Sequence, residues 1–261
     1  MRILIIGGEN MSEINGFDNE YLFVKYLNDK MIRELNPMMY ELIKALFPYD
    51  TEDSVIKAWK NHYKQKTDIF VKVNGTMKGI SIKKGIKNSV HTEGISSFIH
   101  FLIENKVPRE IVIEYLKYQY ADGTTNGKGK YRQSIDQYKQ ENQDKIDKIN
   151  KVLNDEKILK NAILRFVTQG NNANYQIDAI IHGEVDNFIW ATTDVINEII
   201  LLKKNSYSTA VHFGPLICQP KTRCLNYNPL YEKDRFIVQI KWYSLYDDII
   251  YYHYNNRIKE R

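Results

Sequence analysis

One short segment of the sequence carries acidic, basic and hydroxyl side chains at spacings that suit hydrolysis. The segment, residues 66–93, reads KTDIFVKVNGTMKGISIKKGIKNSVHTE. In its second half Ser81 and Lys83 alternate with isoleucines, so an extended chain places both on one face. Asp68 begins the first half, and the dipeptide NG between the halves is typical of a tight hairpin turn. Such a hairpin would bring Asp68 close to Ser81 and Lys83.

One further carboxylate can join this group. Glu93 lies ten positions after Lys83, near the expected start of a helix, from which it can point back towards the strand ends. Glu20 lies on the apolar stripe of an expected N-terminal helix. Two carboxylates with water and a phosphate oxygen suit Mg²⁺, so Asp68 and Glu93 are the predicted metal ligands. The metal would acidify a bound water, while Lys83 orients that water or neutralises charge on the phosphate.

This pattern resembles the PD-(D/E)xK nuclease superfamily, in which an acidic residue, a hairpin and an acid-x-lysine strand follow one another. Asp68 would match the first acid and Lys83 the lysine, but Ser81 stands where the second acid usually lies. A subset of type II restriction endonucleases looks similar, with a Ser-x-Lys strand and the missing carboxylate moved to the next helix, here Glu93. Superfamily members often add a glutamate from an N-terminal helix, which would be Glu20. The resemblance covers roughly residues 18–105.

The resemblance implies a Mg²⁺-dependent endonuclease that cuts double-stranded DNA at a specific sequence and leaves 5′-phosphate and 3′-hydroxyl ends. Ser81 would support the catalytic group. A homodimer is expected if the target is palindromic, because two-fold symmetric DNA favours a two-fold symmetric protein. Two alternatives remain open: a repair, junction-resolving or phage-defence nuclease of the same fold, and a DNA-binding protein whose catalytic site has decayed.

A rival acidic and basic pair lies further along the chain. Asp178 in YQIDAIIHG and the Gln239-x-Lys241 of FIVQIKW also resemble a nuclease pattern, with Glu184 and Asp186 as further carboxylates. The strand that carries Lys241 would otherwise read or support DNA. The sequence alone leaves open which pair is catalytic.

Basic and amide side chains in glycine-rich or polar segments are candidates for DNA contacts. Lysine and arginine on such loops can follow phosphates, whereas arginine and the amides can bind base edges. The predicted DNA-binding residues are Lys84, Lys87, Lys128, Lys130, Arg132, Arg223, Asn226, Arg235, Gln239 and Lys241.

Helices are expected around the hairpin and strands towards the C-terminus. Apolar residues recur at helical spacing over 18–46, with a break at LNP, residues 35–37. Further helices are expected over 52–63, 89–105, 108–120, 132–167 and 194–203, and most of the remainder after 174 reads as strands. We therefore expect a mixed α/β (α+β) protein with a restriction-endonuclease-like core, a central mixed sheet flanked by helices, and a strand-rich C-terminal part that contacts DNA.

We expect a single domain over 1–261, with the catalytic core in 15–120 and a recognition or support part in 160–261. Hydrophobic residues make up 43% of the chain and charged residues 26%, which is ordinary for a globular protein. No apolar run approaches the roughly 18 residues that a membrane span needs, and the opening MRILIIGG is too short for a signal peptide. We therefore expect a cytoplasmic protein. The net charge of +5 permits a polyanionic partner.

Overall fold

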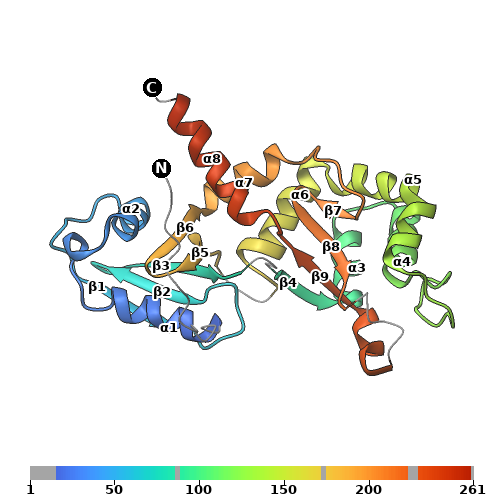
Figure 1. The fold of residues 1–261 in the computed structure, drawn as a ribbon, viewed down its shortest axis with the longest axis horizontal. Helices are drawn as coiled ribbons and strands as arrows, with labels where there is room; N and C mark the ends of the chain where they lie inside the picture. Colours follow the sequence, from blue (N-terminus) through green and yellow to red (C-terminus); the bar gives the residue numbers. More distant parts are fainter. Residues whose placement is uncertain (1–15, 86–88, 172–174, 223–228, 260–261) are drawn as a thin grey trace, which may run out of the picture.

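The computed structural model describes residues 16–85, 89–171, 175–222 and 229–259. Within these ranges the strands form two sheets, which lie next to each other with helices around them (Figure 1). The first sheet consists of β1 (Ile56–Lys60), β2 (Ile69–Val73), β3 (Thr76–Lys83), β5 (Ala179–Glu184) and β6 (Asn187–Thr192), in that order. The second sheet has the order β4-β9-β8-β7, with β4 (Ser89–Gly94), β7 (His212–Phe213), β8 (Leu216–Pro220) and β9 (Ile237–Lys241).

The described helices pack on both sides of the first sheet and behind the second. They are α1 (Gly16–Leu27), η1 (Ile32–Glu34), α2 (Pro37–Leu46), α3 (Ile95–Glu104), α4 (Arg109–Tyr120), α5 (Ile135–Leu153), α6 (Glu156–Ala162), the π-helix η2 (Ile163–Thr168), α7 (Thr193–Leu202), η4 (Pro229–Phe236) and α8 (Leu245–Lys259). No helix in the described part of the chain is long and apolar enough to cross a membrane.

The predicted hairpin is confirmed as β2 and β3. The two strands pair in antiparallel register from Ile69 opposite Ile80 to Val73 opposite Thr76. The two turn residues, Asn74 and Gly75, have φ values of 42° and 90°. A two-residue turn of this kind requires positive φ at both positions, which Asn and Gly adopt at low cost. Beyond the hairpin, β3 pairs in parallel with β5 and β5 pairs antiparallel with β6, so the first sheet is mixed, as predicted.

The two faces of this sheet belong to different hydrophobic clusters. One face, with Val71 and Ile80 among its side chains, packs against Phe23 of α1 and Leu42 of α2. The opposite face contributes Ile180 to the larger cluster, which also contains α3 to α7 and the inner face of the second sheet. A polar residue on this opposite face therefore points towards the second sheet and its helices.

Two predicted elements differ from the observed ones. A helix was expected over 52–63, but β1 forms there because buried Ile56 and Ala58 alternate with exposed Lys57 and the strand pairs with β2. The helix expected from 89 begins only at Ile95, because residues 89–94 pair with β9 as strand β4. The C-terminal part, expected to be rich in strands, also contains the helix α8.

Strands from both predicted parts of the chain meet in both sheets. In the first sheet, β5 and β6 from the C-terminal part extend β1, β2 and β3. In the second, β4 from the N-terminal part pairs with β9. The core and the C-terminal part are thus joined through backbone hydrogen bonds, while the predicted single-domain organisation remains a prediction.

Candidate active site

Asp68, Ser81 and Lys83 meet at one end of the β2–β3 hairpin. The Asp68 carboxylate oxygen Oδ2 accepts hydrogen bonds from Ser81 Oγ at 2.9 Å, from the Ile82 backbone N–H at 2.6 Å and from Lys83 Nζ at 3.3 Å. The side chains of Asp68 and Lys83 are 20% and 24% exposed, so the ion pair is accessible without being fully solvated. The structure therefore brings together these three of the predicted catalytic residues.

Strand alternation explains this convergence. Because Ile69 lies opposite Ile80, the preceding Asp68 lies across from Ser81, and the Asp68 N–H continues the ladder to Ile80 O. Isoleucines 80 and 82 point into the cluster with α1 and α2, which leaves Ser81 and Lys83 on the opposite face. The hydroxyl and the cation on this strand thus face the same side as the Asp68 carboxylate.

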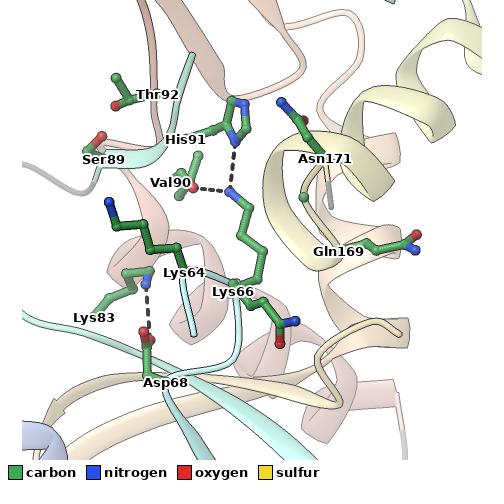
Figure 2. Close-up of a pocket in the computed structure, with 12 residues that line it drawn as sticks. Lys64, Lys66, Asp68, Lys83, Ser89, Val90, His91, Thr92, Gln169 and Asn171 are labelled. Atoms are coloured by element: carbon green, nitrogen blue, oxygen red, sulfur yellow. Dashed lines mark hydrogen bonds and ion pairs between the residues drawn. The ribbon is translucent and has the colours of Figure 1, made fainter. Parts of the chain in front are cut away.

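Asp68 and Lys83 border a pocket of about 410 Å³ between the two sheets. Asp68, Lys66 and Lys83 line it from the hairpin side, and β4 lines it from the second sheet (Figure 2). The segment from Gln169 to Asn171, which follows the π-helix, lies on a third side (Figure 2). Most of the residues that line the pocket are polar or charged.

Glu93 lies on strand β4 rather than at the start of the next helix, which corrects the sequence-based placement. Its side chain is 4% exposed and forms an ion pair with Arg165, whose Nη2 lies 2.8 Å from Oε2. Asn171 Nδ2 donates to the same oxygen at 2.9 Å, and Arg165 Nε approaches Oε1 at 3.4 Å. Both carboxylate oxygens are therefore engaged by protein donors.

The surroundings of Glu93 keep it ionised. Burial, the largest influence, would raise the pKa of the carboxyl, but His91, Arg165 and Asn171 together outweigh it and lower the pKa to about 2. Burial has the opposite effect on the neighbouring imidazole and lowers the pKa of His91 below its ordinary value. His91 Nε2 lies 3.6 Å from Glu93 Oε2, which is too long for a good hydrogen bond.

Lys66 is a residue of this site that the sequence did not reveal. Its Nζ donates to the carbonyl of Val90 and lies 3.1 Å from His91 Nδ1 (Figure 2). It also donates to the carbonyl of Phe166 at 2.6 Å. Burial, followed by the nearby Lys83, lowers the pKa of Lys66 to about 7, although Asp68 and Glu93 act in the opposite direction. Lys66 therefore lies within electrostatic range of both predicted metal ligands.

Glu20 contacts another partner. It lies on α1 and forms an ion pair with Lys60, whose Nζ is 2.7 Å from Oε2. Lys60 lies opposite Ile69 in the strand register, so strand alternation assigns Lys60 to the face of the sheet opposite Asp68. The described contacts thus connect Glu20 to β1 at the edge of the first sheet and not to the Asp68 carboxylate.

The rival pair is separated between the two sheets. Asp178 precedes β5 in the first sheet and binds Lys78 Nζ and the Gly79 backbone N–H, each at 2.8 Å. Lys241 ends β9 in the second sheet. Of the rival carboxylates, Glu184 forms an ion pair with Lys84 and Asp186 is exposed in the turn before β6. Asp178 and Lys241 therefore do not lie on paired strands, whereas Asp68 and Lys83 lie at the same end of one hairpin.

Seven of the ten predicted DNA-binding residues fall into three groups. Lys128 and Lys130 are exposed on the loop after α4. Arg132 and Arg235 anchor this loop instead, since Arg132 Nη2 donates to Gln119 O and Arg235 Nη1 to Gly127 O, each at 2.7 Å. Lys87, Arg223 and Asn226 lie outside the described residues.

Gln239 and Lys241 lie on the open face of the second sheet. In β9, buried Val238 and Ile240 alternate with half-buried Gln239 and Lys241. Across the strands, Gln239 lies between Thr92 of β4 and Gln219 of β8, so polar side chains follow one another across the sheet. Thr92 also lines the pocket beside Asp68. The open face of the second sheet therefore continues directly into the pocket.

The donors around Asp68 suit Mg²⁺ better than a metal that requires a full protein cage. Among the described residues, no three His, Cys, Asp or Glu side chains are grouped as metal ligands. Within the described ranges, the three hydrogen bonds to the Asp68 carboxylate converge on Oδ2, and Oδ1 could serve as a metal ligand. Mg²⁺ is commonly held by one or two carboxylates together with substrate phosphate and water, so the site fits this ion.

Comparison with known proteins identifies the fold. No protein-family model and no curated protein sequence matches this chain significantly. Among solved structures, the chain is similar to restriction endonuclease MspI in complex with its cognate DNA, with a TM-score of 0.54 and 14% sequence identity. The match covers 87% of this chain and 91% of the MspI chain. The chain therefore has a restriction-endonuclease-like fold, as the resemblance of the hairpin had suggested.

Proposed function

We propose that this protein is a Mg²⁺-dependent endodeoxyribonuclease of the type II restriction kind, which cuts double-stranded DNA at a specific sequence. The convergence of Ser81 Oγ, the Ile82 N–H and Lys83 Nζ on one oxygen of Asp68 carries this proposal. The restriction-endonuclease-like fold and the DNA bound to MspI support it. Such an enzyme would act in the cytoplasm.

In the proposed reaction, water attacks the phosphorus of one phosphodiester and the 3′-oxygen leaves, which gives 5′-phosphate and 3′-hydroxyl ends. Asp68 Oδ1 would hold Mg²⁺, which lowers the pKa of a bound water and stabilises charge on the phosphate. Lys83 would orient the water and neutralise the additional negative charge on the phosphate oxygens. Ser81 and the Ile82 N–H would keep the Asp68 carboxylate in a fixed orientation.

Glu93 is the second metal ligand predicted from the sequence, and this role is a separate part of the proposal. Arg165 contacts both oxygens of Glu93 and Asn171 contacts Oε2, so a Mg²⁺ ion bound directly by Glu93 would share these oxygens with protein donors. Titrating the cleavage rate of Glu93→Gln with Mg²⁺ decides the matter. A large rise in the Mg²⁺ concentration at half-maximal rate supports a ligand, and an unchanged value assigns Glu93 a supporting role.

We name the hairpin β2–β3 with Asp68, Ser81 and Lys83 the catalytic hairpin, and the sheet β4-β9-β8-β7 the recognition sheet.

We propose that Gln239 and Lys241 bind base edges, since glutamine suits adenine and lysine suits guanine in the major groove. Lys84, Lys128 and Lys130 would contact phosphates. A homodimer would match a palindromic target.

Digestion of unmethylated plasmid and phage DNA with and without Mg²⁺ tests the proposal. Discrete fragments that require Mg²⁺ are expected, and sequencing their ends gives the recognition sequence and the cut position. Cutting at DNA junctions or mismatches irrespective of sequence would instead indicate a structure-selective nuclease. DNA binding without any Mg²⁺-dependent cutting would indicate a non-catalytic DNA-binding protein.

A further inference from the structure

Two irregular backbone segments meet at the pocket. In β4, Ser89 lies opposite Lys241 and His91 lies opposite Ile240, so Val90 is an extra residue that forms a β-bulge. On the neighbouring side, residues 163–168 form a π-helix that ends beside the pocket. Bulges and π-helices both leave backbone groups without regular partners and are frequent near functional sites.

One side chain binds a carbonyl from each irregular segment. Lys66 Nζ donates to Val90 O in the bulge and to Phe166 O in the π-helix, at 2.6 Å for the latter. The carbonyls of a final helical turn have no partner within the helix and favour a cation. Lys66 thereby connects the segment leading into β2 with residues 24 and 100 positions further along the chain.

The third contact of Lys66 continues into the buried ion pair. Lys66 Nζ lies 3.1 Å from His91 Nδ1, and the other ring nitrogen of His91 lies 3.6 Å from Glu93. Glu93 in turn binds Arg165 of the π-helix. Three protein groups thus surround Lys66 Nζ: Val90 O, Phe166 O and His91 Nδ1.

We infer that Lys66 is a positioning residue that fixes the recognition sheet against the catalytic hairpin, so that correct base contacts on β4 and β9 align Asp68 and Lys83 with the phosphate. This inference rests on the proposed function. Lys66 is two residues before Asp68, and the bulge that it binds lies between Ser89 and Thr92 at the edge of the pocket. A shift of β4 relative to the hairpin would therefore move the bound DNA relative to the catalytic group.

Three variants test the inference: Lys66→Met removes the donors and keeps the chain length, Lys66→Arg keeps the charge, and Lys64→Met is the matched control. Lys64 also lines the pocket, is exposed, and lies two residues earlier. Each variant is measured for DNA affinity without Mg²⁺, for single-turnover cleavage of the cognate site, and for cleavage of sites with one wrong base pair.

We expect Lys66→Met to bind cognate DNA nearly as well as the wild type but to cleave it about 100-fold more slowly, because misplacement by about 1 Å can cost that much. The ratio of its cleavage rates on the cognate site and on single-mismatch sites should decrease. The cleavage rate and discrimination of Lys66→Arg should lie between those of the wild type and Lys66→Met, since a planar guanidinium cannot reach three acceptors grouped around one point. In Lys64→Met, the cleavage rates of cognate and mismatched sites should change by the same factor.

Wild-type cleavage rate and discrimination in Lys66→Met would overturn the inference. So would a proportional loss of binding and cleavage in Lys66→Met equal to that of Lys64→Met, because Lys66 would then act as a simple phosphate-binding charge. If Lys66→Met does not fold, Lys66→Arg decides, and wild-type behaviour of that variant overturns the inference. An inactive wild-type protein would overturn the proposed function itself. This outcome is recognised from the wild type alone, which would then give no DNA fragments.

Discussion

The Ser81 hydroxyl donates a hydrogen bond of 2.9 Å to the Asp68 carboxylate from the neighbouring strand. A hydroxyl thus lies where a second carboxylate would be expected in the superfamily that the hairpin resembles, and it stabilises the first carboxylate instead of adding a charge. With one carboxylate beside the pocket mouth and Lys83 next to it, the metal would depend more strongly on phosphate and water ligands.

The hydroxyl of Ser81 should assist catalysis without being essential. Ser81→Ala removes one of three donors to Asp68 Oδ2, and we expect cleavage to slow about 10-fold, which corresponds to about 1.4 kcal/mol and is typical for a hydrogen bond to a charged group. Single-turnover cleavage with saturating Mg²⁺ measures this effect. A loss as complete as that of Asp68→Asn would contradict a supporting role and would make the hydroxyl itself a metal or water ligand.

The buried Glu93–Arg165 pair should make stability depend on pH in the acid range. The pKa of Glu93 is lowered from 4.5 to about 2 in the folded protein, so its contribution is complete above pH 4.5 and is lost as the pH falls from 4.5 towards 2. We expect Glu93→Gln to reduce the free energy of unfolding at pH 7 by about 3 kcal/mol, the cost of breaking a buried ion pair. Its stability should also fall less steeply than that of the wild type below pH 4.5.

Urea denaturation between pH 2 and 7 tests this pH dependence, with Glu41→Gln on the exposed face of α2 as the matched control. The control should keep the wild-type slope. If Glu93→Gln also keeps the wild-type slope between pH 4.5 and 2, the lowered pKa of Glu93 is not the source of acid sensitivity.

Gln239 should contribute to sequence selection more than to general DNA affinity. Gln239→Ala is expected to cost about 1–3 kcal/mol of discrimination at one adenine position of the site and to leave the salt dependence of binding unchanged. Lys128→Ala is the contrasting variant. Loss of one phosphate contact should reduce the slope of log K against log salt concentration by about 1, without changing base preference. Equal effects of both variants on every sequence would contradict base recognition by Gln239.

Asp178 should matter for stability and not for cleavage. Asp178→Asn disturbs the contacts to Lys78 Nζ and the Gly79 N–H, which hold the start of β5 beside β3. We expect a loss of about 1–2 kcal/mol in the free energy of unfolding, while the single-turnover cleavage rate stays within about 3-fold of the wild type. Abolished cleavage in a folded Asp178→Asn protein would transfer the active site to the rival pair.

Local sequence patterns predicted the catalytic hairpin, because the turn residues Asn74 and Gly75 and the alternation of Ser81 and Lys83 are properties of adjacent residues. The mixed fold followed from the same patterns. The short strand β1 was mistaken for helix because its five residues carry only two fully buried positions, Ile56 and Ala58. Its pairing with β2 decides its structure, and that pairing is a tertiary property.

The environment of Glu93 could not be predicted in this way. The helix expected from 89 placed Glu93 near the active centre, whereas pairing of β4 with β9 turns its side chain towards Arg165, 72 positions away. Lys66 was missed for the same reason, since its partner Phe166 is 100 positions away. Contacts of this range depend on how the two sheets pack, and no local spacing encodes them.

The most direct test of the account is digestion by Lys83→Ala beside the wild type and Lys72→Ala, with Mg²⁺ present. Lys72 is an exposed lysine on the same hairpin and controls for loss of one positive charge. We expect discrete DNA fragments from the wild type and Lys72→Ala and none from Lys83→Ala. All three proteins should still bind DNA. Discrete fragments from a folded Lys83→Ala protein would contradict the assignment of the active site to Asp68 and Lys83.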